Sequence, residues 1–196
     1  MILVGVAGNK GSGKNTFAKE CINDLACNYG KVAYEMSWAE LLKVSAAKAL
    51  GYEFDSVSEY LEWADSFKQV ADVYVTDNGR IVQQITGREF LQNYGTEAHR
   101  EVFDDDFWVN AFWNSNIFRD DSVVFICDCR FPNEIQSIKE HGGIVVQIQR
   151  DNVDNNDSHA SEQGIDLADV DIIIDNNSTI EELKESAEVF INEILS

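Results

Sequence analysis

The sequence is poor in positive charge. Its 196 residues include 15 lysines and arginines against 35 aspartates and glutamates, a formal net charge of −20 at pH 7. Binding to nucleic acids or anionic membranes requires clustered cations that neutralise phosphates, so this balance argues against both partners. We expect the excess acid to lie on a solvated surface. The scarcity also makes each arginine informative, because an acidic protein must gather its few cations wherever it binds an anion.

Long apolar runs and sorting segments are missing too. No apolar stretch approaches the roughly 20 residues that span a bilayer, so we expect no membrane helix. Residues 1–4 run directly into an apolar segment and leave no room for a signal peptide, which predicts a cytoplasmic protein. No repeat, linker or low-complexity tract interrupts the chain, and we predict a single domain over residues 1–196.

The cysteines do not have the spacing of a metal site. Cys21 and Cys27 form Cys-x₅-Cys, and Cys127 and Cys129 form Cys-x-Cys within an apolar run. Neither is a usual zinc spacing. We therefore predict reduced thiols in the core.

A glycine-rich stretch follows the first apolar run. Gly8, Gly13 and Lys14 fit the P-loop pattern G-x-x-x-x-G-K, with an apparent strand before them and a helix after them. Glycines let successive N–H groups point into one concavity, and the helix adds its positive N-terminal end. This predicts a site for the phosphates of ATP, formed by Gly8, Asn9, Lys10, Gly11, Ser12, Gly13, Lys14, Asn15 and Thr16.

The same loop predicts a magnesium site. Mg²⁺ prefers oxygen ligands, and Asn15 stands where P-loops usually have Ser or Thr. Either the amide oxygen of Asn15 or the hydroxyl of Thr16 would serve the metal. Asp128 ends an apolar strand, as a Walker-B acid does, and would bind Mg²⁺ mostly through water.

Apolar strands alternate with amphipathic helices along the chain. This predicts an α/β fold with a buried parallel sheet whose ligands bind at the carboxyl ends of its strands. After the first strand we expect strands at 31–36, 123–128, 144–149 and 170–175, and helices at 15–28, 38–50 and 105–118. A further helix is expected to start at Glu134 and run to His141, and a last one to follow a cap formed by Ser178 and Glu181.

Residues 38–118 are predicted to form a substrate-binding helical region. Its least regular part, 52–85, suggests an insertion with a short helix near residues 60–63 and a hairpin at 73–82, whose Asn-Gly suits a type I′ turn. Thr86 and Glu89 form a capping box, and Gly95 is a candidate helix end. Polar and aromatic side chains around that helix suggest a pocket for a phosphate and a base: Arg88, Gln92, Thr96, Arg100 and Trp108.

Two further segments carry candidate ligands. Arg130 offers a rigid donor fork for phosphate oxygens, and Glu134 either pairs with an arginine or favours a helix N-terminus. Arg150 precedes a polar loop, 151–164, that suits a lid over ATP. His159 in that loop is more simply a capping or surface residue than a general base. Trp108 is as easily a core residue as a platform for a base.

Taken together, these segments resemble the deoxynucleoside monophosphate kinases of tailed bacteriophages. The P-loop, Gly87–Arg100, Asp104–Val109, Asp128–Glu134 and Ser158–Glu162 match in order over nearly the whole chain, except residues 52–80. The resemblance implies an NMP-kinase-like P-loop NTPase fold of three layers, with a five-stranded sheet of order 2-3-1-4-5. It also implies transfer of the γ-phosphate of ATP to a dNMP with Mg²⁺, location in the host cytoplasm if phage-encoded, and suggests a homodimer.

Roles follow from the matching positions. The resemblance gives Lys14, Asp128, Arg130 and Glu134 to catalysis, and a dNMP site to Arg88, Gln92, Gly95, Thr96, Arg100, Trp108, Asp128 and Arg130. Asn15 departs from the pattern, since many relatives have Asp there. Two alternatives remain: a kinase similar to dephospho-coenzyme A kinase, and a nucleotide-binding sensor without catalysis.

Overall fold

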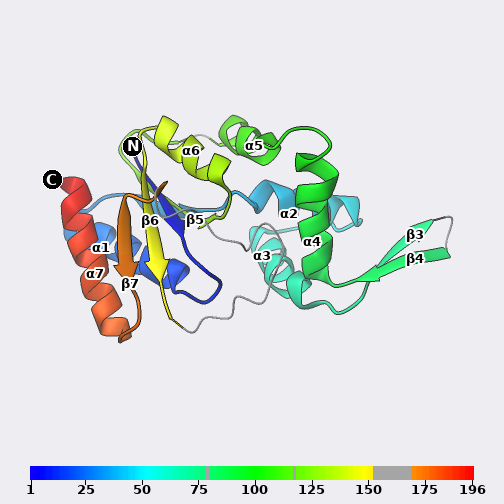
Figure 1. Ribbon diagram of the computed structural model, residues 1–196, viewed down its shortest axis with the longest axis horizontal. Coiled ribbons are helices and arrows are strands. Elements are labelled where there is room, and N and C mark those ends of the chain that lie inside the picture. Colours follow the sequence, from blue (N-terminus) through cyan, green and yellow to red (C-terminus); the bar gives the residue numbers. More distant parts are fainter. Residues whose placement is uncertain (78–79, 117, 152–168) are drawn as a thin grey trace. The chain divides into compact units, whose positions relative to one another are not determined.

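The computed structural model describes residues 1–77, 80–116, 118–151 and 169–196 (Figure 1). It divides into two compact units, the first of Met1–Trp38 and Trp113–Ser196, the second of Ala39–Phe112. The second unit lies within the predicted substrate-binding region 38–118. That role, like the prediction of a single domain, stays a prediction.

The first unit contains one parallel sheet. Its strands lie in the order β2-β5-β1-β6-β7, and every neighbouring pair runs parallel. Counted within this sheet, that is the predicted order 2-3-1-4-5. The predicted starts at residues 31 and 170 were early, since those strands begin at Ala33 and Ile172. The strands are β1 Ile2–Ala7, β2 Ala33–Met36, β5 Val123–Cys129, β6 Ile144–Gln149 and β7 Ile172–Asp175.

Helices cover both faces of this sheet (Figure 1). Helices α1 (Lys14–Tyr29) and α7 (Ile180–Leu195) pack against each other on one face, and α6 (Pro132–Glu140) lies on the other. The strands show the required alternation, since Val4 and Val6 face α1 and α7, whereas a Cβ on Gly5 would meet Ile138 of α6. This is the predicted three-layer α/β fold.

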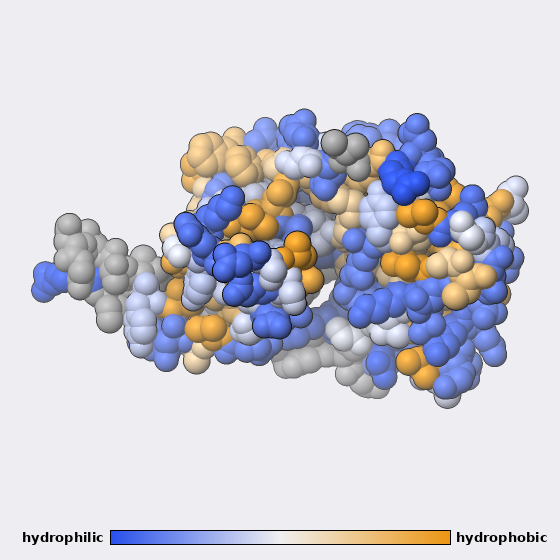
Figure 2. Space-filling view, turned by 180° about the vertical axis from the view of Figure 1, so that it is seen from behind, coloured by the Kyte–Doolittle hydropathy of each residue, from blue (hydrophilic) through white to orange (hydrophobic). Residues whose placement is uncertain are grey.

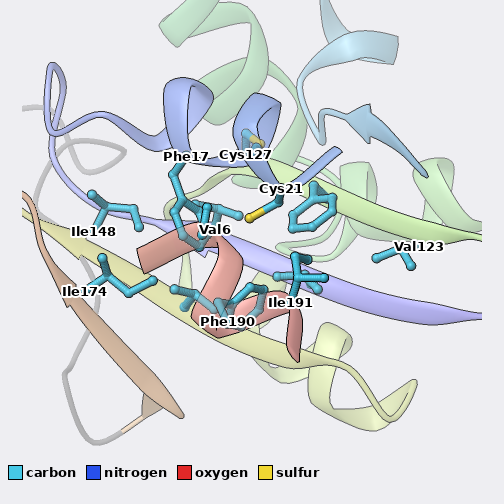
Figure 3. Close-up of a cluster of buried hydrophobic side chains, with 14 of the residues drawn as sticks. Val6, Phe17, Cys21, Val123, Cys127, Ile148, Ile174, Phe190 and Ile191 are labelled. Atoms are coloured by element: carbon cyan, nitrogen blue, oxygen red, sulfur yellow. The ribbon is translucent and has the colours of Figure 1, made fainter. Parts of the chain in front are cut away.

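The core of the first unit lies between the sheet and the helix pair (Figure 3). Phe17 of α1 and Phe190 of α7 pack with ring centroids 5.5 Å apart, in one cluster with Val6 and Ile148 of the sheet. Full burial of each such side chain contributes about 1.5–3 kcal/mol. This packing fixes the carboxyl ends of the central strands, where the glycine-rich loop begins.

The thiols follow the prediction with one exception. Cys21, Cys127 and Cys129 are buried, and burial raises the pKa of each thiol, which keeps it protonated at neutral pH. Cys27 is exposed, so placing it in the core was wrong. Among the described residues no group of three or more His, Cys, Asp and Glu side chains forms a metal site.

One predicted helix cap was wrong by one residue. The side chain of Thr179, rather than Ser178, accepts a hydrogen bond from the backbone N–H of Glu182, and α7 begins at Ile180. Ser178 with Glu181 and Thr179 with Glu182 both fit the spacing of a capping box. The backbone decides between them, because Thr179 has the extended conformation of an N-cap (φ −85°, ψ 165°).

The second unit is mostly helical, with a small hairpin. Its core gathers Trp63 and Phe67, whose rings stack 4.8 Å apart, with Leu91 and the alanines Ala46, Ala47 and Ala64. The predicted hairpin is present, but its Asn-Gly turn lies outside the described residues. The elements are α2 Glu40–Ala49, α3 Val57–Ser66, β3 Val73–Asp77, β4 Arg80–Ile85, α4 Gly87–Gly95, a π-helical turn Thr96–Arg100 and α5 Phe107–Ser115, which continues into the first unit.

No helix in the described parts of the chain has the length and apolar character needed to span a membrane. Figure 2 shows hydrophilic residues over much of one face. Among the residues whose burial is described, Glu134 is the one buried carboxylate, so the other acidic residues of that set are at least partly exposed, as expected.

Candidate functional site

The glycine-rich loop joins β1 to α1 and needs glycine at two positions. Gly8 and Gly13 have φ angles of 139° and 103°, which side chains rarely allow. A Cβ on Gly8 would lie 2.4 Å from the carbonyl oxygen of Ile148, and one on Gly13 would lie 2.3 Å from Nδ2 of Asn176. Conformation and close packing therefore both require glycine in this loop.

Lys14 is held across the loop by the loop's own backbone. Its Nζ donates hydrogen bonds to the carbonyl oxygens of Gly8, at 2.6 Å, and Asn9, at 2.8 Å. The ammonium group thus lies next to the backbone that would surround a phosphate. The predicted grouping of Lys14 with the glycine-rich loop is present in the structure.

Ser12 lies inside the loop. Its residue is 1% exposed, and its Oγ has no hydrogen-bond partner among the described residues. A Cβ on Gly8 would lie 2.7 Å from that oxygen, which places the hydroxyl against the start of the loop. A buried hydroxyl without a partner costs about 1–3 kcal/mol, so this group is suited to a ligand that offers an acceptor.

Asn15 contacts a residue that the sequence did not single out. Its Nδ2 donates to Oε1 of Glu35 at 2.9 Å. A carboxylate only accepts hydrogen bonds, so the NH₂ group of Asn15 must face Glu35 and its Oδ1 is left for another partner. Glu35 therefore orients the residue that follows the P-loop lysine.

Asp128 connects the carboxyl ends of β5 and β2. Its Oδ2 accepts from the hydroxyl of Ser37 at 2.6 Å, and its Oδ1 accepts from the backbone N–H of Trp38 at 2.8 Å. Besides burial, Glu35 and then Asp128 raise the pKa of the Cys127 thiol, which places both carboxylates near that side chain. Two acidic groups therefore lie near one point at the edge of the sheet.

Glu134 caps α6. The residue is 3% exposed, and its Oε2 accepts from the backbone N–H groups of Arg130, at 2.8 Å, and Phe131, at 3.1 Å. Of the two predicted alternatives, the helix N-terminal role is confirmed. Through this cap Glu134 also fixes the backbone from which the Arg130 side chain extends.

The chain offers an internal comparison for this cap. Glu89 is exposed and accepts from the backbone N–H of Thr86 in the predicted capping box, and these hydrogen bonds lower the pKa of Glu89. We expect Glu134→Ala to lower the free energy of unfolding by about 2 kcal/mol or more, because two N–H groups lose their acceptor. Glu89→Ala should cost clearly less, because water can replace an exposed acceptor. Urea unfolding measures both, and equal losses would contradict the structural role given to Glu134.

The predicted dNMP residues lie in the second unit, apart from Asp128 and Arg130. Arg88 and Gln92 are half-buried, one turn apart on α4, as the spacing predicted. Arg100 is 8% exposed, and its Nη1 donates to the carbonyl oxygen of Asp105 at 3.2 Å. Thr96 begins the π-helical turn, directly after the end of α4.

Trp108 has the environment of a core residue. It is 5% exposed, and its Nε1 donates to the carbonyl oxygen of Gly95 at 2.9 Å. The rings of His99 and Phe107 pack against it, with centroids 5.0 and 4.9 Å away. This burial favours the packing alternative, and base stacking by Trp108 stays an untested prediction.

The structure does not bring every predicted ATP-site residue to the P-loop. Arg150 is exposed after the end of β6, and the proposed lid with His159 lies outside the described residues. Asn176 was missed, although it contacts the P-loop. The only signal for it was its place directly after a predicted strand.

A parallel sheet of this order, with a glycine-rich loop and lysine between its first strand and first helix, defines the class of P-loop nucleotide-binding folds. A family model described as deoxynucleotide monophosphate kinase matches residues 36–187. A putative deoxynucleotide monophosphate kinase of Acanthamoeba polyphaga mimivirus is 33% identical, over 93% of this chain and 92% of its own. The chain belongs to the deoxynucleotide monophosphate kinase family, a family of phosphotransferases, and the resemblance found in the sequence is confirmed.

Less similar relatives carry names of the same activity. The deoxynucleotide monophosphate kinase of Enterobacteria phage T4 is 27% identical over 60% of this chain and 48% of its own, so this chain spans about half its length. The deoxynucleoside-5'-monophosphate kinase of Escherichia phage T5 is 28% identical, over 71% of this chain and 72% of its own. Among solved structures, dephospho-CoA kinase from Campylobacter jejuni is 15% identical over 98% of this chain and 96% of its own, with a TM-score of 0.49.

Proposed function

We propose that the protein transfers the γ-phosphoryl group of ATP to a deoxynucleoside monophosphate, producing ADP and a deoxynucleoside diphosphate. The observation that carries this proposal is the loop from Gly8 to Lys14 in a chain of this family. The matched family span begins at residue 36, after the loop. Loop and family are therefore two separate supports for the same function.

The reaction needs positioning and charge stabilisation more than proton transfer. An oxygen of the dNMP phosphate attacks the γ-phosphorus, the bond from that phosphorus to the β–γ bridging oxygen breaks, and ADP leaves with the bonding electrons. The N–H groups of the loop and the ammonium of Lys14 would hold the ATP phosphates. The hydroxyl of Ser12 would donate to a phosphate oxygen and so gain the acceptor that it lacks among the described residues.

Arg130 would stabilise the group in transfer. Its guanidinium provides paired donors for phosphate oxygens, and Glu134 holds its backbone by the hydrogen bond described above. Arg88, Gln92, Thr96 and Arg100 would bind the dNMP. Trp108 would contribute by holding Gly95 in place through its indole N–H.

Several oxygen atoms near the P-loop also suit Mg²⁺, which in kinases binds one or two protein carboxylates together with phosphates and water. The candidate ligands are Oδ1 of Asn15, the hydroxyl of Thr16, and the carboxylates of Asp128 and Glu35. Glu35 supplies a negative charge next to Asn15. When bound, Mg²⁺ would neutralise charge on the phosphate oxygens.

This assignment makes a prediction about charge placement. Glu35→Gln should raise the Mg²⁺ concentration needed for half-maximal ADP binding about fivefold, because it removes a carboxylate near the metal. Adding Asn15→Asp to the Glu35→Gln protein should reverse most of that change, because it places a carboxylate at position 15, next to the residue that lost its charge. Calorimetric titration of ADP at several Mg²⁺ concentrations measures both effects. Glu20→Gln, which removes an acid from the same helix, is the control, and equal Mg²⁺ dependence in all variants would refute the role of Glu35.

The proposed function is tested by a substrate panel. With ATP and Mg²⁺, ADP formation should depend on one or more dNMPs and be weak with ribonucleotides. Turnover only with dephospho-coenzyme A would keep a P-loop kinase but refute the dNMP substrate. ATP binding without turnover on any substrate would support a sensor. We also propose a cytoplasmic location. Analytical sedimentation of the purified protein would test the suggested homodimer.

A further inference from the structure

The turn between β7 and α7 reaches back to the P-loop through one side chain. Asn176 is 8% exposed, and its Nδ2 donates to the carbonyl oxygen of Ser12 at 2.7 Å. Residues 12 and 176 belong to the same unit but lie at opposite ends of the chain. No local sequence pattern connects them.

Asn176 is itself anchored by the sheet. Its backbone N–H donates to the carbonyl oxygen of Gln149 at 2.7 Å, which extends the pairing of β6 with β7 by one residue. The side chain therefore extends from a fixed backbone. The same edge of the sheet supports the start of the loop, since Gly8 packs closely on the carbonyl of Ile148 in β6.

The hydrogen bond fixes one peptide unit of the loop. The Ser12–Gly13 peptide is planar and trans, so its N–H points opposite to its C=O. Because Asn176 holds the C=O, the N–H of Gly13 points away from Asn176. That N–H belongs to the residue directly before α1, where P-loops direct N–H groups at phosphate.

We propose that Asn176 is a positioning residue that fixes the phosphate-binding shape of the P-loop by holding the Ser12–Gly13 peptide with its N–H turned toward the nucleotide phosphates. The close approach of Asn176 explains part of the need for glycine at position 13. Asn176 does not touch the reacting groups and acts through the loop. The proposal rests on the proposed function only in that the loop binds nucleotide phosphates.

Two variants and a phosphate probe test this. Asn176→Ala removes the donor, and Asn176→Asp keeps the shape but replaces the donor with a carboxylate that repels the Ser12 carbonyl. We expect the Kd for ADP and for inorganic tripolyphosphate to rise about tenfold in Asn176→Ala and further in Asn176→Asp. Tripolyphosphate has no base, so equal weakening of both ligands assigns the effect to the loop rather than to base recognition.

The control is Asn192→Ala in α7. The side chain of Asn192 accepts a hydrogen bond from Tyr29 of α1 at 2.7 Å, within the same unit but away from the loop. It should bind both ligands as the wild-type protein does, whatever its melting temperature. Binding is measured by calorimetry well below the melting temperature of each variant, so that loss of stability does not count as loss of affinity.

The outcomes separate the claims. Wild-type affinity for tripolyphosphate in both Asn176 variants would overturn the proposal, as would weakening of ADP alone. A wild-type protein that binds both ligands without transferring phosphate would refute the proposed function and leave the role of Asn176 standing. A wild-type protein that binds neither ligand would overturn both.

Discussion

Lys14→Ala is expected to lower kcat/KM about a hundred- to a thousandfold. The lysine is the one side-chain cation that the P-loop motif places against the β- and γ-phosphates, and removing a single preorganised donor from a transition state costs roughly a hundred- to a thousandfold. The hydrogen bonds of Nζ to Gly8 and Asn9 fix its starting position in the loop. Initial rates with ATP and a dNMP measure the loss.

The fold should survive this change. The ammonium group donates to the half-buried loop backbone of Gly8 and Asn9, so the melting temperature should shift little. Lys19→Ala removes an exposed cation from the same helix and is the matched control. A Lys14→Ala protein that is folded and keeps a rate within about tenfold of the wild type would remove Lys14 from the mechanism.

Arg130→Ala is expected to have a similarly large effect, but on kcat. Its guanidinium would contact the phosphoryl group in transfer, so kcat should fall about a hundred- to a thousandfold while the Kd for ATP changes little. Arg130→Lys keeps the charge but loses the paired donors, and should recover only part of the rate.

The control for Arg130 is Arg119→Ala. Arg119 is exposed and pairs with Asp121 at 3.6 Å, so its removal lowers the positive charge of the protein equally without touching the proposed site. Single-turnover and steady-state kinetics separate binding from transfer. If Arg130→Ala lowers ATP affinity and leaves the single-turnover rate intact, Arg130 binds ATP rather than stabilising transfer.

The fold could be predicted from the sequence because its determinants are local or shared by the family. Apolar runs between glycines mark strands of a buried parallel sheet, and the P-loop needs only residues 8–14 and its neighbours. The strand order came from the resemblance, since periodicity alone does not order strands. One failure was a shift of one residue: Ser178 and Thr179 both fit a cap, and the backbone conformation at Thr179 decided between them. Another was Cys27, which is exposed although core thiols were predicted.

The site was less predictable, because side-chain environments depend on tertiary packing. A tryptophan after an acidic run fits a base platform and a core position equally, and only the burial of Trp108 and its bond to Gly95 separate them. Glu35 and Asn176 carry no motif. They reach the P-loop because the fold brings the carboxyl ends of β2 and β7 to the same edge as that of β1, and that edge is known only once the strands are paired.

The most direct test of the central claim is transfer of labelled phosphate. The purified protein is incubated with ATP labelled in its γ-phosphate, Mg²⁺ and each dNMP in turn, and the products are separated by chromatography. We expect labelled deoxynucleoside diphosphate in amounts equal to the ADP formed, and far less of it in the same time with Lys14→Ala. Label found only in inorganic phosphate, or no labelled product with any dNMP, would contradict it.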